Sequence, residues 1–142
     1  MTIATDLVAS MEDYFLGREL RHDFWAEDVV IEVPFARPGR PRRYAGRREF
    51  LDATRESRAA LPVRFEAMRD VTVHEAGDTF VIEYELAGTV LTTGHQAAAR
   101  FITVARVRDG RVVLWREYQD TAAIDAALGA GRSAAGHDNA GG

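Results

Sequence analysis

The sequence predicts one α+β domain, in which helices pack across one face of a curved, mainly antiparallel sheet. Helical patterns dominate the first part of the chain, and alternating strand patterns dominate the second half. Asp109-Gly110 separates two of these alternating runs, and Asp-Gly is the strongest short signal for a hairpin because both turn residues must tolerate positive φ. The chain has 142 residues, of which 46% are hydrophobic. That length suits one core and is too short for two ordinary domains.

Three helices and one strand are expected before the long strands. In residues 3–17 a helical stripe ends at a natural stop, Gly17. A second short helix is expected at about 19–25. Residues 29–33 form a strand that Pro34 ends, because proline cannot donate a ladder hydrogen bond. The loop 34–46 is rich in proline and arginine and should lie on the surface, and a third helix follows at 48–60. The stripe of the first helix consists of Leu7, Val8, Met11, Tyr14 and Phe15.

The second half contains four strands, a short helix and a tail. The strands are expected at residues 62–74, 80–87, 97–108 and 112–119, and the helix at 121–128, ending at Gly129. The domain therefore spans residues 1–128. Residues 129–142 are rich in Gly, Ala and Ser without a large apolar side chain, and are expected to be a disordered tail.

Composition excludes several classes of function. The chain has no cysteine, which removes disulfides, thiolate catalysis and cysteine-bound metals. The net charge of -4 argues against a nucleic-acid partner. No apolar run approaches the roughly 20 residues that cross a bilayer, and no basic signal region opens the chain, so a cytoplasmic, soluble protein is expected. Neither a cofactor nor a metal is expected: there is no dinucleotide fingerprint, and the histidines at 22, 74, 95 and 137 have no metal-ligand spacing.

Glu117 is the most informative candidate residue. Strand alternation places it on one face with Val113, Trp115 and Gln119, and places Val112, Leu114, Arg116 and Tyr118 on the other. A carboxyl group among apolar neighbours must be hydrogen-bonded, paired or protonated, and the same conditions produce a general acid or base. The alternative is a structural carboxylate that pairs with Arg100 or Arg116 or faces a water-filled mouth.

Further candidates come from other parts of the chain. Tyr84 and Tyr14 could donate a phenol hydrogen bond to a developing oxyanion, although both also fit the role of core tyrosines. Asp120 could cap the last helix. The arginines from Arg37 to Arg48 are either solvated surface or, at the mouth of a cone, a site that attracts an anionic group. The other polar pocket candidates are Thr103 and Gln119, and the apolar walls include Ile82, Leu86, Phe101 and Trp115.

Four stretches carry a family resemblance that covers about residues 5–128. They are Phe24-Trp25-Ala26-Glu27-Asp28-Val29, Glu32-Val33-Pro34-Phe35 with the Pro-Gly-Arg-Pro loop, Gly46-Arg47, and Asp109-Gly110-Arg111 leading to Trp115-Arg116-Glu117-Tyr118. In their order and spacing the sequence resembles the SnoaL-like branch of the NTF2-like superfamily. The group concerned includes ketosteroid isomerases, limonene epoxide hydrolase and the phenazine-biosynthesis A/B proteins.

The resemblance implies a cone with a deep apolar pocket for a small hydrophobic molecule, and a homodimer paired through the outer sheet face. It also implies a pocket acid at Glu117, pocket positions at Val33 and Phe35, and an assisting role for His95, since related polyketide cyclases have a histidine on that strand. Other family residues do not match. The epoxide hydrolase's Arg and second Asp fall on Tyr84 and Leu86, and the ketosteroid isomerase base and its partner fall on Val33 and Thr103.

Three hypotheses of function follow. The first is an enzyme that uses Glu117 for acid-base chemistry of the isomerase, cyclase or dehydratase type on a hydrophobic oxygenated metabolite, with epoxide hydrolysis less favoured. The second is a protein that binds such a metabolite without turning it over. The third is a structural module that dimerises through the outer face.

Overall fold

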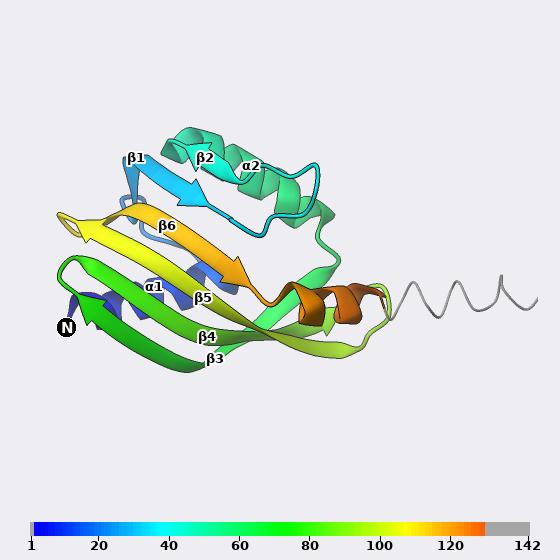
Figure 1. The fold of residues 1–142 in the computed structure, drawn as a ribbon. Helices are drawn as coiled ribbons and strands as arrows, with labels where there is room; N and C mark the ends of the chain where they lie inside the picture. The colour runs from blue at the N-terminus through cyan, green and yellow to red at the C-terminus, as the bar shows by residue number, and fades with distance from the viewer. Residues whose placement is uncertain (1, 130–142) are drawn as a thin grey trace, which may run out of the picture.

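The computed structural model describes residues 2–129, which form one curved sheet with helices packed around it (Figure 1). The expected tail lies outside these residues, apart from Gly129. The elements follow the chain in the order α1 (Ile3–Phe15), β1 (Trp25–Glu32), β2 (Arg43–Ala45), α2 (Arg47–Ala60), β3 (Val63–Ala76), β4 (Thr79–Val90), β5 (Gln96–Arg108) and β6 (Arg111–Gln119). A further helix covers residues 121–129.

The sheet is mainly antiparallel, as expected. Its strand order is β2-β1-β6-β5-β4-β3, and only the β1/β6 pair is parallel. The predicted hairpin joins β5 and β6. Its turn residues Asp109 and Gly110 have φ values of 53° and 75°, so both occupy the left-handed region that this turn requires. Among residues 2–129, no helix is long and apolar enough to cross a membrane.

The prediction of three N-terminal helices is wrong. The described residues contain three helices, but they are spread along the chain: α1 precedes the sheet, α2 lies between β2 and β3, and the third follows β6. Residues 19–25 form no helix because their end joins the sheet. The backbone N–H of Val112 donates to the carbonyl of Phe24 at 2.8 Å, and β1 already begins at Trp25. Phe24 and Trp25 are both buried in the core.

The loop 34–46 contains a strand that its composition did not predict. The N–H of Val33 donates to the carbonyl of Arg42 at 2.9 Å, which turns the chain back along β1. Residues of β2 then pair antiparallel with β1, with Ala45 opposite Val30. This edge strand holds the arginine-rich loop beside the sheet.

The sheet bends along the antiparallel pair of β3 and β4. The pairing register shifts between Phe65 and Ala67 and again between Arg69 and Thr72. Gly88 on β4 lies opposite the first shift, and a Cβ atom there would stand 2.3 Å from the carbonyl oxygen of Arg64. A side chain cannot fit at that approach, so glycine permits the bend that gives the sheet its concave face.

One register shift changes the predicted faces of β6. Leu114 pairs with Arg106 and Val112 pairs with Val107, so Val113 is an extra residue in the strand. Because of this bulge, Val112 is only 1% exposed and belongs to the core. The expectation that Val112 contributes to the outer face is therefore wrong. Dimerisation through the outer face stays a prediction.

Candidate active site

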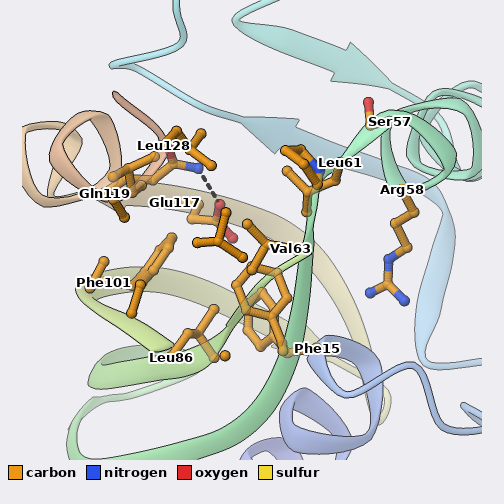
Figure 2. Close-up of a pocket in the computed structure, with 18 of the residues that line it drawn as sticks. Phe15, Ser57, Arg58, Leu61, Val63, Leu86, Phe101, Glu117, Gln119 and Leu128 are labelled. Carbon is orange, nitrogen blue, oxygen red and sulfur yellow. Dashed lines mark hydrogen bonds between the residues drawn. The ribbon is translucent and has the colours of Figure 1, made fainter. Parts of the chain in front are cut away.

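A cavity of about 440 Å³ opens between the concave face of the sheet, α2, the loop 34–42 and the helix 121–129. Figure 2 shows its lining side chains converging from these separate segments. Much of the wall is aliphatic or aromatic, and the polar lining residues are few. They are Tyr14, Arg37, Arg40, Tyr44, Thr54, Ser57, Arg58, Glu117 and Gln119.

Glu117 lies in the second half of β6 and faces this cavity, as its predicted face requires. One carboxylate oxygen accepts a hydrogen bond from Gln119 Nε2 at 2.8 Å, and the other accepts a long one from Trp115 Nε1 at 3.4 Å. Figure 2 shows the Gln119 contact as a dashed line. Both donors are neutral, so they position the carboxyl group without supplying a counter-charge.

The predicted alternative, a structural salt bridge from Glu117 to Arg100 or Arg116, does not form. Arg116 points to the other face and bonds Glu32 at 3.2 Å, while Arg100 is paired with Asp70 at 4.0 Å. Within residues 2–129, Glu117 forms no salt bridge. The side chain of Glu117 is partly exposed to the cavity, but the surrounding protein excludes most of the water that would solvate the carboxyl group. This burial raises the pKa of the Glu117 carboxyl above 4.5, and the hydrogen bonds from Gln119 and Trp115 offset only part of the rise.

Tyr14 reaches the cavity from the last turn of α1. Its ring packs edge-on against Trp25 and Trp115, with centroid separations of 5.4 and 6.2 Å. The guanidinium carbon of Arg58 lies over the ring, 4.6 Å from its centroid. Burial, followed by the charge of Glu117, raises the pKa of Tyr14 to about 12. The Tyr14 hydroxyl therefore stays protonated at neutral pH. It can donate or accept a hydrogen bond, but it does not act as a base.

Tyr84 has a different environment from the one its predicted role requires. It is fully buried, and its hydroxyl shares a 2.7 Å hydrogen bond with the hydroxyl of Thr103, which is buried too. Its ring stacks on Phe101 with 11° between the planes. Tyr84 is absent from the cavity lining, so the structure places it beneath the wall, where its hydroxyl already has a partner. Burial, and then the charge of Glu117, raise the pKa of Tyr84 well above 10.0.

The remaining predicted residues divide into three groups. Leu86, Phe101 and Gln119 line the cavity as expected. Ile82, Thr103 and Trp115 lie on the predicted face but are 0–2% exposed, so they support the wall from below. Val33, Phe35 and His95 do not line the cavity.

The last group was placed by family position, and the local structure explains the difference. Phe35 is 58% exposed and packs against Tyr118 on the outside of β6. His95 is exposed at the β4–β5 turn, where its backbone carbonyl accepts from the N–H of Val90. Asp120 behaves as the capping hypothesis requires, since its Oδ1 accepts from the N–H of Ala123 at 3.0 Å.

Sequence reasoning missed the α2 and C-terminal sides of the cavity. Thr54, Ser57 and Arg58 come from α2, and Ala123, Ile124, Ala127 and Leu128 come from the last helix. No spacing in the sequence connects these segments with Glu117, because they meet only through tertiary packing. The arginine cluster of the loop 34–46 was the one sequence feature that indicated this side of the cavity, since Arg37 and Arg40 line it. Among residues 2–129, no group of three or more acidic or histidine side chains is placed to hold a metal ion.

Fold and site together define an NTF2-like protein with a pocket for a small molecule. The model of the SnoaL-like domain family matches residues 19–115 of the chain. The chain belongs to the SnoaL-like family. The resemblance seen in the sequence is thereby confirmed.

Individual relatives agree with this assignment. Protein YesE of Bacillus subtilis is 28% identical over 120 residues, which cover 82% of this chain and 80% of that protein. An uncharacterised PhzA/B-like protein of Pseudomonas aeruginosa is 31% identical over 115 residues, covering 80% of this chain and 79% of that protein. A crystal structure from Bacillus subtilis, of a protein provisionally assigned as an isomerase, aligns with a TM-score of 0.78 at 26% identity. It covers 89% of this chain and 93% of that chain.

Proposed function

We propose that this protein is a cofactor-independent enzyme that moves a proton on a hydrophobic, oxygenated small molecule, with Glu117 as the acid-base group. The observation that carries the proposal is the state of Glu117: a carboxyl group in the wall of a largely apolar cavity, held by two neutral donors and without a cationic partner among residues 2–129. A general acid or base needs this kind of environment, because desolvation moves its pKa toward the working pH.

The proposed step is an isomerisation that begins beside a carbonyl group. The Glu117 carboxylate takes a proton from the carbon next to the carbonyl, and the electron pair of the broken C–H bond forms the C=C bond of an enolate. Negative charge then develops on the carbonyl oxygen. Glu117, now protonated, returns the proton to another carbon of the conjugated system, so the reaction needs no redox partner or metal.

Tyr14 is the best-placed donor for that oxygen. It lines the same cavity, and with a pKa of about 12 it keeps its proton when the substrate becomes anionic. Tyr84 is less suited because it is fully buried and does not line the cavity. The B. subtilis protein provisionally assigned as an isomerase is consistent with this type of chemistry.

The competing function is binding without turnover, which the same cavity would serve. The two are separated by solvent exchange: the protein is incubated in D₂O with a panel of cyclic enones and β,γ-unsaturated ketones, and deuterium uptake is followed by mass spectrometry. We expect Glu117→Gln to lower the exchange rate by about 10²- to 10⁴-fold, the usual contribution of a general acid-base group. Glu75→Gln makes the same chemical change at an exposed strand position and should leave the rate unaltered.

Binding must be measured on the same variants. Glu117→Gln keeps the size of the side chain, so ligands that exchange in the wild type should still bind to the variant. Exchange that continues at the wild-type rate in Glu117→Gln would refute the proposal. Ligands that bind without any exchange in the wild type would favour the binding function.

A further inference from the structure

The charges in the cavity wall are unevenly distributed. Three arginines, Arg37, Arg40 and Arg58, line the cavity, whereas Glu117 is its only acidic lining residue among those described. Figure 2 shows Glu117 on one side of the lining and Ser57 and Arg58 on the other. The acid and the positive charge of α2 are therefore at separate places in the same cavity.

The three arginines differ in how far their charge is already compensated. Arg37 is paired with Asp125 of the last helix. The Arg58 guanidinium donates to the carbonyl of Tyr14, near the end of α1, and lies over the Tyr14 ring. Arg58 is thus partly committed to holding that helix end, where a cation is favourable.

Arg40 differs from the other two because the partner of its side chain is a neutral hydroxyl. Its hydrogen bond in the described part of the chain is a long one, from Nη1 to the hydroxyl of Ser57 at 3.5 Å. No salt bridge to Arg40 forms within residues 2–129. The planar guanidinium group offers five N–H donors in a fork that matches a carboxylate or phosphate. Most of these donors have no protein partner among residues 2–129, and Arg40 lies at the cavity wall.

We propose that the ligand of this cavity is an amphipathic anion, whose carboxylate or phosphate group binds Arg40 and the Ser57 hydroxyl while its apolar body fills the cavity. This inference adds a substrate class to the proposed acid-base site and rests on the ligand entering that site. An anchor on the α2 side would leave the far end of the ligand against the opposite wall, where Glu117 lies. It would also keep the ligand's charge away from a carboxyl group that is costly to ionise.

Two fluorescent probes with almost the same body test this. 1-Anilinonaphthalene-8-sulfonate carries an anionic group, and N-phenyl-1-naphthylamine is the same skeleton without it. Wild-type protein should bind the sulfonate more tightly than the neutral amine at low ionic strength. The preference should decrease as NaCl is raised through about 0.1 M, where the Debye length is about 10 Å.

Variants assign the preference to a residue. Arg40→Ala should weaken sulfonate binding by about tenfold, the lower range for a charge-assisted hydrogen bond, and leave binding of the neutral amine within about twofold. Arg42→Ala removes the same charge from the same loop, but Arg42 does not line the cavity, so this variant should bind both probes like the wild type. Arg40→Lys should recover part of the loss.

The outcomes are distinct from those of the exchange experiment. A wild-type protein without preference for the sulfonate, or an equal loss of binding in Arg40→Ala and Arg42→Ala, overturns the anion site and leaves the role of Glu117 standing. A sulfonate preference that depends on Arg40, in a protein whose deuterium exchange does not depend on Glu117, supports the anion site while refuting the proposed chemistry.

Discussion

Replacing Glu117 by Gln should change the pH dependence of folding stability. Burial raises the pKa of Glu117 above the value of 4.5 that it has when unfolded. Between pH 4.5 and the raised pKa, the folded protein therefore binds more protons than the unfolded chain. By linkage, the contribution of Glu117 to the free energy of unfolding decreases as pH rises through this window and is constant above it. A glutamine does not titrate, so Glu117→Gln lacks this decrease.

The magnitude follows from the contacts of the carboxyl group. At low pH the variant should be less stable by about 1 kcal/mol, the value of one hydrogen bond, because an amide has one oxygen to accept from both Trp115 and Gln119. As pH rises, the stability of the variant relative to wild type should increase by about 1.4 kcal/mol for each unit by which the pKa is raised. A rise of more than about one unit therefore makes the variant the more stable protein at neutral pH.

Urea unfolding between pH 4.5 and 8 measures this difference, with the fluorescence of the two tryptophans as the probe. Glu75→Gln, at an exposed position, is the control and should follow the wild-type curve at constant separation. If the Glu117→Gln and wild-type curves also stay parallel, Glu117 is not desolvated in the folded protein. The physical basis of the proposed acid-base role would then be absent.

Two predictions concern the sheet that holds the site. Gly88→Ala should lower the free energy of unfolding by about 1–3 kcal/mol, because its Cβ would overlap the Arg64 carbonyl oxygen, whereas Gly129→Ala, with open space around it, should have no such effect. Equal urea midpoints for the two variants would show that the strands relax freely. Thr103→Val should cost about 1–3 kcal/mol by leaving the buried Tyr84 hydroxyl without its partner, and Thr103→Ser should restore most of it. A valine variant as stable as wild type would contradict that role.

The strands of the second half could be predicted because local rules determine them. Alternation over β4 and β5 matches a sheet with one covered face, and the Asp109-Gly110 turn sets the register between β5 and β6. The prediction of a helix at 19–25 was wrong because it used only the local pattern. The pairing of Phe24 with Val112 depends on a residue far along the chain. The same holds for β2, which exists only because β1 offers it a partner.

The site could be predicted only on the strand that carries the acid. The alternation of side chains along β6 was enough to predict that Glu117 and Gln119 face the cavity. Positions inferred from the family resemblance, such as Val33, Phe35 and His95, do not line the cavity, because a match in sequence order does not determine the face on which a side chain lies. The α2 residues could not be found at all, since helix periodicity identifies a buried stripe but not what lies opposite it.

The bulge at Val113 explains how one short strand serves both stability and the site. Before the bulge, Val112 is buried with Leu7 and Phe24 in the hydrophobic core. Beyond it, Trp115 is 2% exposed, and Glu117 and Gln119 face the open cavity. The apolar half of β6 thus fixes the backbone of its polar half. A carboxyl group whose ionisation opposes folding can be kept at Glu117 because the packing of Val112 and Trp115, rather than its own contacts, holds the strand in place.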